Sequence, residues 1–366
     1  MRSGSRGEGA AAPTPDAASR DRLAAFAFPG GGGKNGGVNE AADPSPTDPP
    51  PRSSPQPTWA RHVAQAVIRG SSYPGRRLVG SLHRKRSRRE GGRRFTATAH
   101  DGVKLDAWRL PASPDAETRR LPLVLVHGWM EMKEFHFAPA RRLAELGHDV
   151  VLYDHRGHGN SGGKGSTFGV LERHDLTRVI DAAVTRGLIA PRVVTLGFSL
   201  GAATVLQHAP LDDRVVGVVA IAPFLDLRTA VESFRRRLAP WMDAPWLQDG
   251  FDQAASRHGF AIDEASTLDA VRSLSKPVLM VEGGRDTVLP PTHHTEKLAE
   301  AIDPRLLERV RVPAANHFTI CRRPWPTMNR AVRAFCDRLA AGEGADSGPG
   351  MAASGGSHAD PGRGFY

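Results

Sequence analysis

The residues best suited to nucleophilic chemistry are Gly197-Phe198-Ser199-Leu200-Gly201. This pentapeptide closes the apolar run RVVTLG and opens the helical pattern SLGAATVLQHA. A serine held between a strand and a helix adopts a strained backbone, and glycines two residues to either side relieve the crowding of the turn. Such a turn exposes the hydroxyl and directs the helix N-terminus toward any anion that forms there. The pattern therefore predicts that Ser199 is a nucleophile. The alternative is a tight turn without chemistry.

A serine hydroxyl is a weak nucleophile, so it needs a general base, and the base needs a carboxylate that orients it. His317 lies after the final apolar run, in RVPAANHF, and is predicted to be the base. Two carboxylates compete for the third role. Asp286 follows the run PVLMVEGG in GGRDTVLP and is preferred, because its turn precedes the last helix-strand unit that delivers His317. Asp226, in APFLDL, is the alternative acid, although capping the next helix is its favoured role.

The other histidines of interest have simpler explanations. His155 and His158 lie in the loop sequence YDHRGHGNSGG, where no cysteine or carboxylate cluster completes a metal site. His293 and His294 are adjacent at the start of a helical stretch and cannot share one face of it. Both pairs are predicted to be structural or solvated, and no metal or cofactor is expected.

Acyl transfer also requires two hydrogen-bond donors for the oxyanion of the tetrahedral intermediate. The backbone N–H of Leu200, directly after the nucleophile, is the first candidate. The second is the backbone N–H of Trp129, in the turn that follows the apolar run LVLV in LVLVHGWM.

The elements that must position these groups are short apolar runs alternating with helical patterns. Strands are predicted at residues 95–100, 104–110, 122–126, 149–153, 192–197, 215–221, 277–281 and 308–312, and helices include 171–186 and 326–340. Alternating strands and helices favour parallel pairing, whereas Asp101-Gly102 marks an antiparallel hairpin at the start. The predicted fold class is α/β, an eight-stranded, mostly parallel sheet with helices on both faces.

Regions of different composition flank this domain, which is predicted to span residues 95–340. Residues 1–58 are a Gly/Pro/Ala-rich tail predicted to be disordered, and residues 341–366 form a flexible tail. Residues 59–94 are a basic amphipathic linker, with Trp59, Val63 and Val67 on one helical face. The whole net charge of +10 is carried by residues 1–94. An anionic membrane surface is one partner for this linker, a solvated Arg-rich segment is the alternative, and no nucleic acid is expected because no aromatic residues interleave with the arginines.

The two cysteines, Cys321 and Cys336, are too few for a disulfide framework, and Cys336 is predicted to be a buried free thiol in the last helix. Neither an apolar signal-peptide core nor a run of about 18 apolar residues occurs. A cytoplasmic protein, or one bound peripherally to a membrane, is expected.

The ordered motifs HGW, YDHRGHGNSGG, GFSLGA, GGRDTVLP and ANHF resemble those of the α/β-hydrolase superfamily, in its serine hydrolase branch of esterases, lipases and peptidase-like enzymes. The similarity spans about residues 95–340 and also includes the hairpin sequence Asp101-Gly102-Val103-Lys104-Leu105. It implies Ser199, Asp286 and His317 as a catalytic triad, with Trp129 and Leu200 as the oxyanion hole. The same triad in this family serves esters, thioesters, lipids and peptides, so the substrate stays open.

Residues 226–275 are expected to form a small lid after the sixth strand. The lid carries apolar residues beside three arginines, and these either shape an acyl or aromatic pocket or pack the lid onto the body: Phe234, Trp241, Trp246, Leu247 and Phe251, with Arg235, Arg236 and Arg237. The expected function is a carboxylesterase acting on small or medium esters through an acyl-enzyme. The alternatives are a thioesterase or acyltransferase with the same triad, and a catalytically silent binding protein of the same fold.

Overall fold

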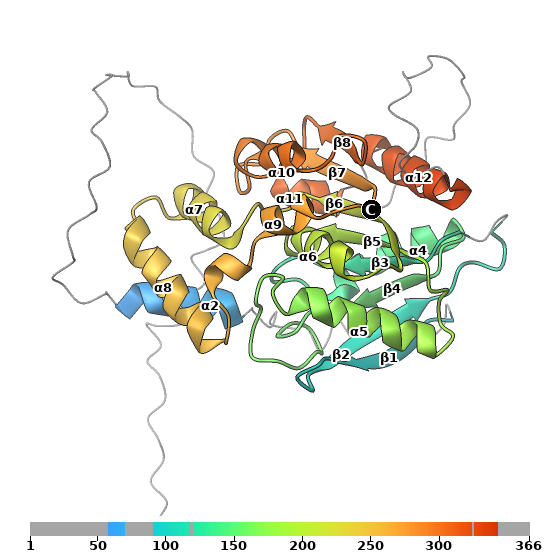
Figure 1. Ribbon diagram of the computed structural model, residues 1–366, viewed down its shortest axis with the longest axis horizontal. Helices are drawn as coiled ribbons and strands as arrows, with labels where there is room; N and C mark the ends of the chain where they lie inside the picture. Colours follow the sequence, from blue (N-terminus) through green and yellow to red (C-terminus); the bar gives the residue numbers. More distant parts are fainter. Residues whose placement is uncertain (1–57, 70–90, 117–119, 324–325, 343–366) are drawn as a thin grey trace, which may run out of the picture. The chain divides into compact units, whose positions relative to one another are not determined.

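Strands and helices alternate along the chain, and the strands pair into one sheet (Figure 1). A computed structural model describes residues 58–69, 91–116, 120–323 and 326–342 of the 366-residue protein. Within these ranges eight strands pair in the order β1-β2-β4-β3-β5-β6-β7-β8. Their bounds are β1 Arg93–Thr98, β2 Lys104–Leu110, β3 Leu123–Val126, β4 Val150–Tyr153, β5 Val193–Phe198, β6 Val215–Ile221, β7 Val278–Gly283 and β8 Leu307–Val312. The predicted α/β sheet is confirmed.

The sheet is antiparallel only at its beginning. β1 pairs with β2 and β2 with β4 in antiparallel register, and every later pair is parallel. Every residue of β3, β4, β5 and β7 is buried, as expected of parallel strands that are covered on both faces. Because the parallel strands all run the same way, their carboxyl ends meet at one edge, where Ser199, Asp286 and the turn at Gly128 follow β5, β7 and β3.

Helices cover both faces of the sheet. One hydrophobic cluster joins α5, α6, α9 and α10 to one face, and a second cluster joins α4, α11 and α12 to the other. The helical bounds are α4 Phe137–Glu145, α5 Glu172–Thr185, α6 Leu200–His208, α9 Thr267–Arg272, α10 Thr295–Ala301, α11 His317–Arg322 and α12 Pro326–Ala341. Cys336 of α12 is buried as predicted, and burial raises the pKa of its thiol to about 12.

The connection between β6 and β7, hereafter the insertion, holds two further helices before α9. These are α7 Leu227–Leu238 and α8 Ala244–Arg257, and short 3₁₀ turns occur at η1 Lys133–His136, η2 Ala209–Leu211, η3 Ile262–Glu264 and η4 Pro291–His293. The first described helix, α2 Thr58–Arg69, lies beside α8 although almost 200 residues separate them in sequence (Figure 1). A third hydrophobic cluster joins α2, α7 and α8 to the region around Leu200.

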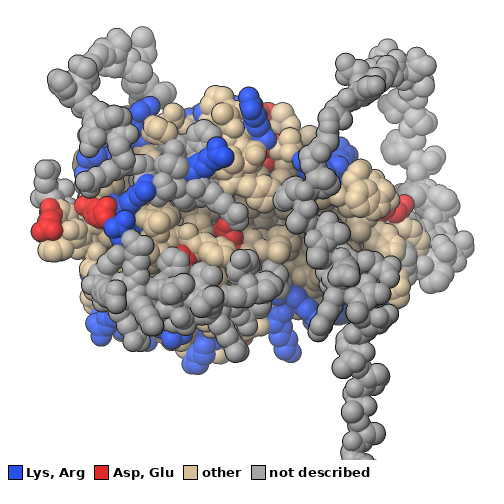
Figure 2. Space-filling view, turned by 180° about the vertical axis from the view of Figure 1, so that it is seen from behind, with Lys and Arg blue, Asp and Glu red and all other residues tan. Residues whose placement is uncertain are grey.

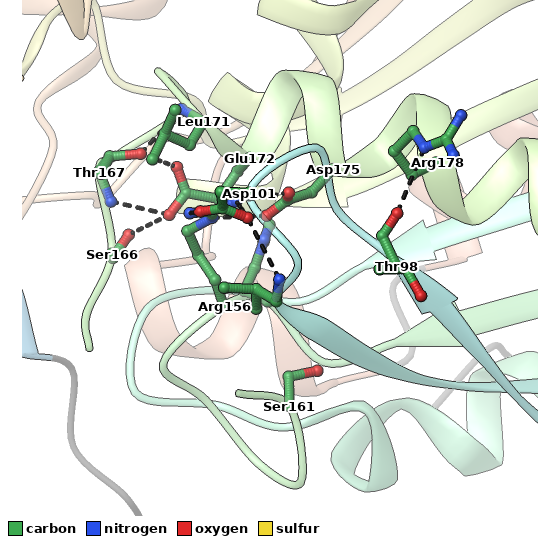
Figure 3. A network of polar contacts seen from close by, with 12 residues as sticks. Thr98, Asp101, Arg156, Ser161, Ser166, Thr167, Leu171, Glu172, Asp175 and Arg178 are labelled. Atoms are coloured by element: carbon green, nitrogen blue, oxygen red, sulfur yellow. Dashed lines mark hydrogen bonds and ion pairs between the residues drawn. The ribbon is translucent and has the colours of Figure 1, made fainter. Parts of the chain in front are cut away.

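A buried polar network holds the loop that follows β4 (Figure 3). Glu172, at the start of α5, accepts hydrogen bonds from Ser166 Oγ at 2.9 Å, Thr167 N at 2.8 Å, Thr167 Oγ1 at 2.6 Å and Gly169 N at 2.9 Å. Arg156 binds Asp175 through two nitrogens, at 2.7 and 2.6 Å. A fully buried carboxylate is tolerated here because both of its oxygens accept hydrogen bonds.

The N-terminal part of the chain differs from the sequence expectation in two respects. β1 begins at Arg93, inside the range predicted as a linker, because Arg93 and Arg94 face solvent on an edge strand. Helix α2 was expected to present Trp59, Val63 and Val67 on its apolar face, but these are only partly buried, while Ala60, Ala64 and Ile68 are fully buried. Alanines at the contact let the backbones of α2 and α8 approach closely.

The remaining expectations for the flanks fall mainly outside the described residues. The predicted disordered tail, most of the basic run from Arg84 and nearly all of residues 341–366 belong to this part. On the face shown in Figure 2, the Lys and Arg side chains of the described surface are spread singly rather than gathered in one patch. None of the helices that the structure describes combines the length and apolar character needed to cross a bilayer.

Candidate active site

Ser199 occupies a strained turn between β5 and α6. Its backbone angles are φ 51° and ψ −113°, a conformation that non-glycine residues rarely adopt. Both flanking glycines are sterically required, as predicted. A Cβ atom on Gly197 would lie 2.2 Å from the carbonyl oxygen of Gly201, and one on Gly201 would lie 2.1 Å from the carbonyl oxygen of Val126. The turn leaves Ser199 half-buried at the carboxyl edge of the sheet.

Ser199, His317 and Asp286 form one hydrogen-bonded line. Nε2 of His317 lies 3.1 Å from Oγ of Ser199, and Nδ1 of His317 lies 2.7 Å from Oδ2 of Asp286. The ionised carboxylate only accepts, so Nδ1 carries the proton that it donates, and Nε2 of the neutral ring is left to accept the Ser199 hydroxyl proton. Folding thus brings Ser199, 118 residues before His317, and Asp286, 31 residues before it, within hydrogen-bond reach of one imidazole.

Local structure fixes both ends of this line. The second oxygen of Asp286 accepts the backbone N–H groups of Val288 at 3.0 Å and Leu289 at 2.8 Å, so the carboxylate cannot rotate freely. His317 is the first residue of α11, and Asn316 caps that helix in a reciprocal capping box with Thr319. Both side chains are buried, His317 at 7% and Asp286 at 5% exposure.

Asp226, the alternative acid, is engaged elsewhere. Its Oδ1 accepts the backbone N–H of Thr229 at 2.7 Å, and its Oδ2 accepts the Thr229 hydroxyl at 2.9 Å. It is the N-cap residue of α7, so the capping role favoured from the sequence is confirmed.

The turn after β3 brings the Gly128–Trp129 peptide to the nucleophile. A Cβ atom on Gly128 would lie 3.5 Å from the carbonyl oxygen of Phe198, the residue before Ser199. The carbonyl oxygen of Gly128 is held twice, by Nδ1–H of His127 at 2.7 Å and by the backbone N–H of Glu131 at 3.3 Å. Since no cis peptide occurs among the described residues, the N–H of Trp129 points opposite to this carbonyl. The orientation of the Trp129 donor is therefore set through the other end of its own peptide group.

The other predicted donor is the backbone N–H of Leu200. Leu200 is the first residue of α6, and the first four N–H groups of an α-helix have no acceptor within the helix. Its side chain is buried in the cluster that joins the insertion to the sheet.

Of the four histidines predicted to be structural or solvated, His155, His158 and His294 are buried. Nε2 of His127 accepts the backbone N–H of His155 at 3.0 Å, which fixes the tautomer with the proton on Nδ1. Burial, with the neighbouring histidines, holds the pKa of His127 well below its ordinary value and that of His155 at about 4. His294 accepts the N–H of Leu225 through Nδ1 and contacts Ser233 through Nε2, whereas His293 is exposed. In the described ranges no three His, Cys, Asp or Glu side chains are grouped to hold a metal ion.

Two residues that support the turn after β3, Glu131 and Lys133, were not identified from the sequence. Glu131 accepts the backbone N–H of Gly128 at 2.8 Å and lies 2.9 Å from Nε2 of His136. Lys133 is fully buried and donates to Asp106 and Asp154, both at 2.6 Å, which ties the segment after the turn to β2 and β4. The Lys133 contacts join positions 27 and 21 residues apart, so neither periodicity nor motif spacing could indicate them.

The chain is similar in sequence to several known proteins. Residues 117–257 match a family model described as serine aminopeptidase, S33. The uncharacterized protein YqkD of Bacillus subtilis is 34% identical over 168 residues, 43% of this chain and 52% of YqkD, so the chain spans about half the length of that relative. The uncharacterized protein YfhR of Escherichia coli is 26% identical over 226 residues, 60% of this chain and 71% of YfhR.

Solved structures show the same fold at low sequence identity. The Pyrococcus furiosus esterase Pf2001 superposes with a TM-score of 0.53 at 22% identity, covering 70% of this chain and 92% of the esterase. A 2,6-dihydroxy-pseudo-oxynicotine hydrolase superposes with a TM-score of 0.56 at 18% identity, covering 72% of each chain. The sheet order and these structural similarities together show that the chain has the α/β-hydrolase fold.

Proposed function

We propose that this protein is a serine hydrolase that cleaves carboxylic esters through an acyl-enzyme, with Ser199 as nucleophile, His317 as general base and Asp286 as the orienting acid. The observation that carries the proposal is the hydrogen-bonded line from Ser199 Oγ through His317 to Asp286, with the serine on a strained strand-to-helix turn. Strain of this kind is maintained where it exposes a reacting group.

In the first step Ser199 Oγ attacks the ester carbonyl carbon while its proton passes to His317 Nε2. Asp286 stays ionised and stabilises the imidazolium. The carbonyl oxygen becomes an oxyanion that accepts hydrogen bonds from the backbone N–H groups of Trp129 and Leu200. Collapse of this intermediate expels the alcohol, which takes the proton from His317.

In the second step water replaces the alcohol. His317 accepts a proton from the water as the water attacks the acyl carbon, and then returns a proton to Ser199 Oγ as the acid leaves. The same geometry serves an acyl thioester, and an acyltransferase differs only in that another hydroxyl or amine replaces water.

Apolar side chains around the site favour an apolar acyl or aromatic group. The rings of Trp129 and Phe234 meet edge to face, with centroids 6.2 Å apart, and Leu200, Val288 and Leu289 belong to the same cluster. Phe234 comes from the insertion, so we expect the insertion to supply part of the acyl-binding surface. The two structural neighbours are named as an esterase and a hydrolase, which is consistent with such a substrate.

The test is hydrolysis of p-nitrophenyl esters of increasing acyl length by the wild-type protein and by Ser199→Ala. We expect the variant to lose turnover by on the order of 10⁶. Ser273→Ala is the matched control, because Ser273 is exposed and its hydroxyl donates only to the carbonyl of Ala270. Undiminished hydrolysis by Ser199→Ala would refute the proposal.

Two further measurements separate the alternatives. Faster turnover of an acyl thioester than of the matching oxygen ester would assign a thioesterase, and acylation of an added alcohol in preference to water would assign an acyltransferase. A folded wild-type protein that neither hydrolyses any acyl donor nor reacts with a fluorophosphonate would instead be a silent binding protein.

A further inference from the structure

Helix α2, which precedes the sheet in sequence, is packed into the insertion as closely as an internal helix. Ala60, Ala64 and Ile68 are fully buried, and α2 lies along α8 (Figure 1). A Cβ atom on Gly250 of α8 would lie 2.8 Å from the carbonyl oxygen of Ala60, so the glycine is what allows the two helices to approach. This contact leaves the buried face of α2 unavailable to a membrane or another partner.

The last turn of α2 is bound by the loops around the proposed active site. The final four carbonyl groups of a helix have no partner within it. Here the carbonyl of Val67 accepts the indole N–H of Trp129 at 3.1 Å, and the carbonyl of Ile68 accepts the backbone N–H of Ser166 at 2.7 Å. Two carbonyl groups that the helix leaves unpaired are thus satisfied by the body of the protein.

The indole of Trp129 is consequently held from two sides. Its N–H binds α2, and its ring packs at 80° against Phe234 of α7. The backbone of the same residue supplies the proposed oxyanion donor. The residue that follows, Met130, has a positive φ of 62°, so the turn is a strained one that needs external contacts to keep its shape.

We propose that α2 is a positioning element for the oxyanion hole, acting through the hydrogen bond from the Trp129 indole to the carbonyl of Val67. The inference rests on the proposed function, because it assigns a purpose to the Trp129 donor in that mechanism. Residues outside the strand-and-helix repeat therefore set the rate of the chemical step. Loosening α2 lowers transition-state stabilisation while ground-state binding of the ester is retained.

The first test is Trp129→Phe, which keeps an aromatic ring against Phe234 but removes the indole N–H. Complete loss of one oxyanion donor costs about 10²–10³ in turnover. Here the donor is displaced rather than deleted, so we expect kcat to fall about tenfold, at the low edge of what mispositioning a catalytic group costs. KM should change less than about twofold, because the interaction is made only in the transition state.

A second readout isolates the oxyanion. A trifluoromethyl ketone adds to the serine and forms a tetrahedral oxyanion, so its affinity should fall by the same factor as kcat/KM. A merely structural role for Trp129 would lower the midpoint of thermal unfolding without changing this affinity relative to that of an unreactive ketone of the same shape.

Gly165→Ala provides a variant that leaves Trp129 intact. A Cβ atom at this position would lie 2.4 Å from the carbonyl oxygen of Ile68, and its three nearest neighbours all belong to α2. The substitution therefore pushes the end of α2 outward, and it should reproduce the loss of kcat. If Trp129→Phe fails to fold, the kcat of Gly165→Ala still tests whether α2 positions the oxyanion hole.

The matched control is Lys276→Met, which removes the hydrogen bonds from Lys276 Nζ to the carbonyl oxygens of Ala209 at 2.6 Å and Asp212 at 2.7 Å, just before β7 and outside both α2 and the Trp129 turn. It should lower stability but leave kcat and ketone affinity unchanged. Unchanged kcat and ketone affinity in folded Trp129→Phe or Gly165→Ala, with an active wild type, would overturn this inference alone. Absence of activity in the wild type would overturn the proposed function as well.

Discussion

Substitution of His127 tests the proposed oxyanion hole sharply, because its two ring nitrogens make different hydrogen bonds. Nδ1–H holds the carbonyl of Gly128 at 2.7 Å, and Nε2 accepts the backbone N–H of His155 at 3.0 Å. The side-chain amide of asparagine reaches approximately as far as Nδ1, and that of glutamine approximately as far as Nε2. His127→Asn therefore keeps the bond to Gly128, whereas His127→Gln keeps the bond to His155.

The magnitudes follow from what each variant loses. In His127→Gln the Gly128 carbonyl retains only the longer 3.3 Å bond from Glu131, so the Trp129 N–H is less firmly oriented. We expect kcat to fall by about 10- to 10²-fold, below the 10²–10³ for deletion of a donor, with little change in KM. In His127→Asn the buried N–H of His155 loses its acceptor, which costs about 1–3 kcal/mol of stability.

The assay is steady-state hydrolysis of a p-nitrophenyl ester alongside urea unfolding of each variant. The account predicts opposite rankings: His127→Gln is the less active variant and His127→Asn the less stable one. Wild-type kcat in a folded His127→Gln protein would refute the reasoning. So would losses of kcat that simply follow the losses of stability in both variants.

Three further outcomes are expected. Asp286→Asn should lower kcat by on the order of 10⁴, whereas Asp226→Asn should keep kcat within about tenfold, and kinetics showing the reverse order would reassign the acid. Glu172→Gln should cost about 2–4 kcal/mol in denaturant unfolding, because its four-donor site is left mispaired (Figure 3), and a loss below 1 kcal/mol would contradict this. Burial lowers the pKa of His148 to about 4 and that of His294 to about 3. The unfolded chain therefore binds protons that the folded chain does not as pH falls below about 6.5, so the urea midpoint should drop between pH 7 and pH 5; an unchanged midpoint would count against buried neutral rings.

The sheet was largely predictable because its strands are short, continuously apolar and separated by helical patterns. The predicted ranges 104–110 and 215–221 coincide with β2 and β6. β1 differs by two residues at each end, since its edge position lets charged residues extend the strand. Arg94 pairs there with Asp106, and such a pairing leaves no mark on the local pattern.

The residues around Ser199 were predictable for a steric reason. The turn has no room for a Cβ atom at positions 197 and 201, so it requires glycine at both. The two glycines of the motif therefore indicate the turn directly. The contacts that orient the Trp129 peptide were not predictable. They involve the main chain of Gly128 and Val67, and a backbone carbonyl places no constraint on the type of residue that carries it.

The docking of α2 against α8 was not predictable from the sequence for a related reason. Large apolar residues such as Trp59 dominate a helical pattern read from sequence, but close helix packing selects small ones, and Ala60 and Ala64 form the contact with α8. An amphipathic helix that is exposed to solvent and one that is packed against another helix show the same spacing of apolar residues. Only the glycine at residue 250, on the partner helix, distinguishes them, and its role is apparent only in three dimensions.

The central claim is that Ser199 is a nucleophile activated by His317. Mapping the adduct of a fluorophosphonate probe by mass spectrometry of the intact, folded protein and its peptides tests this most directly. The account predicts one adduct, on Ser199, that forms at least 10³-fold more slowly in His317→Ala, as the loss of a triad member implies. An adduct on another residue, or equal labelling of Ser199 without the imidazole, would contradict it.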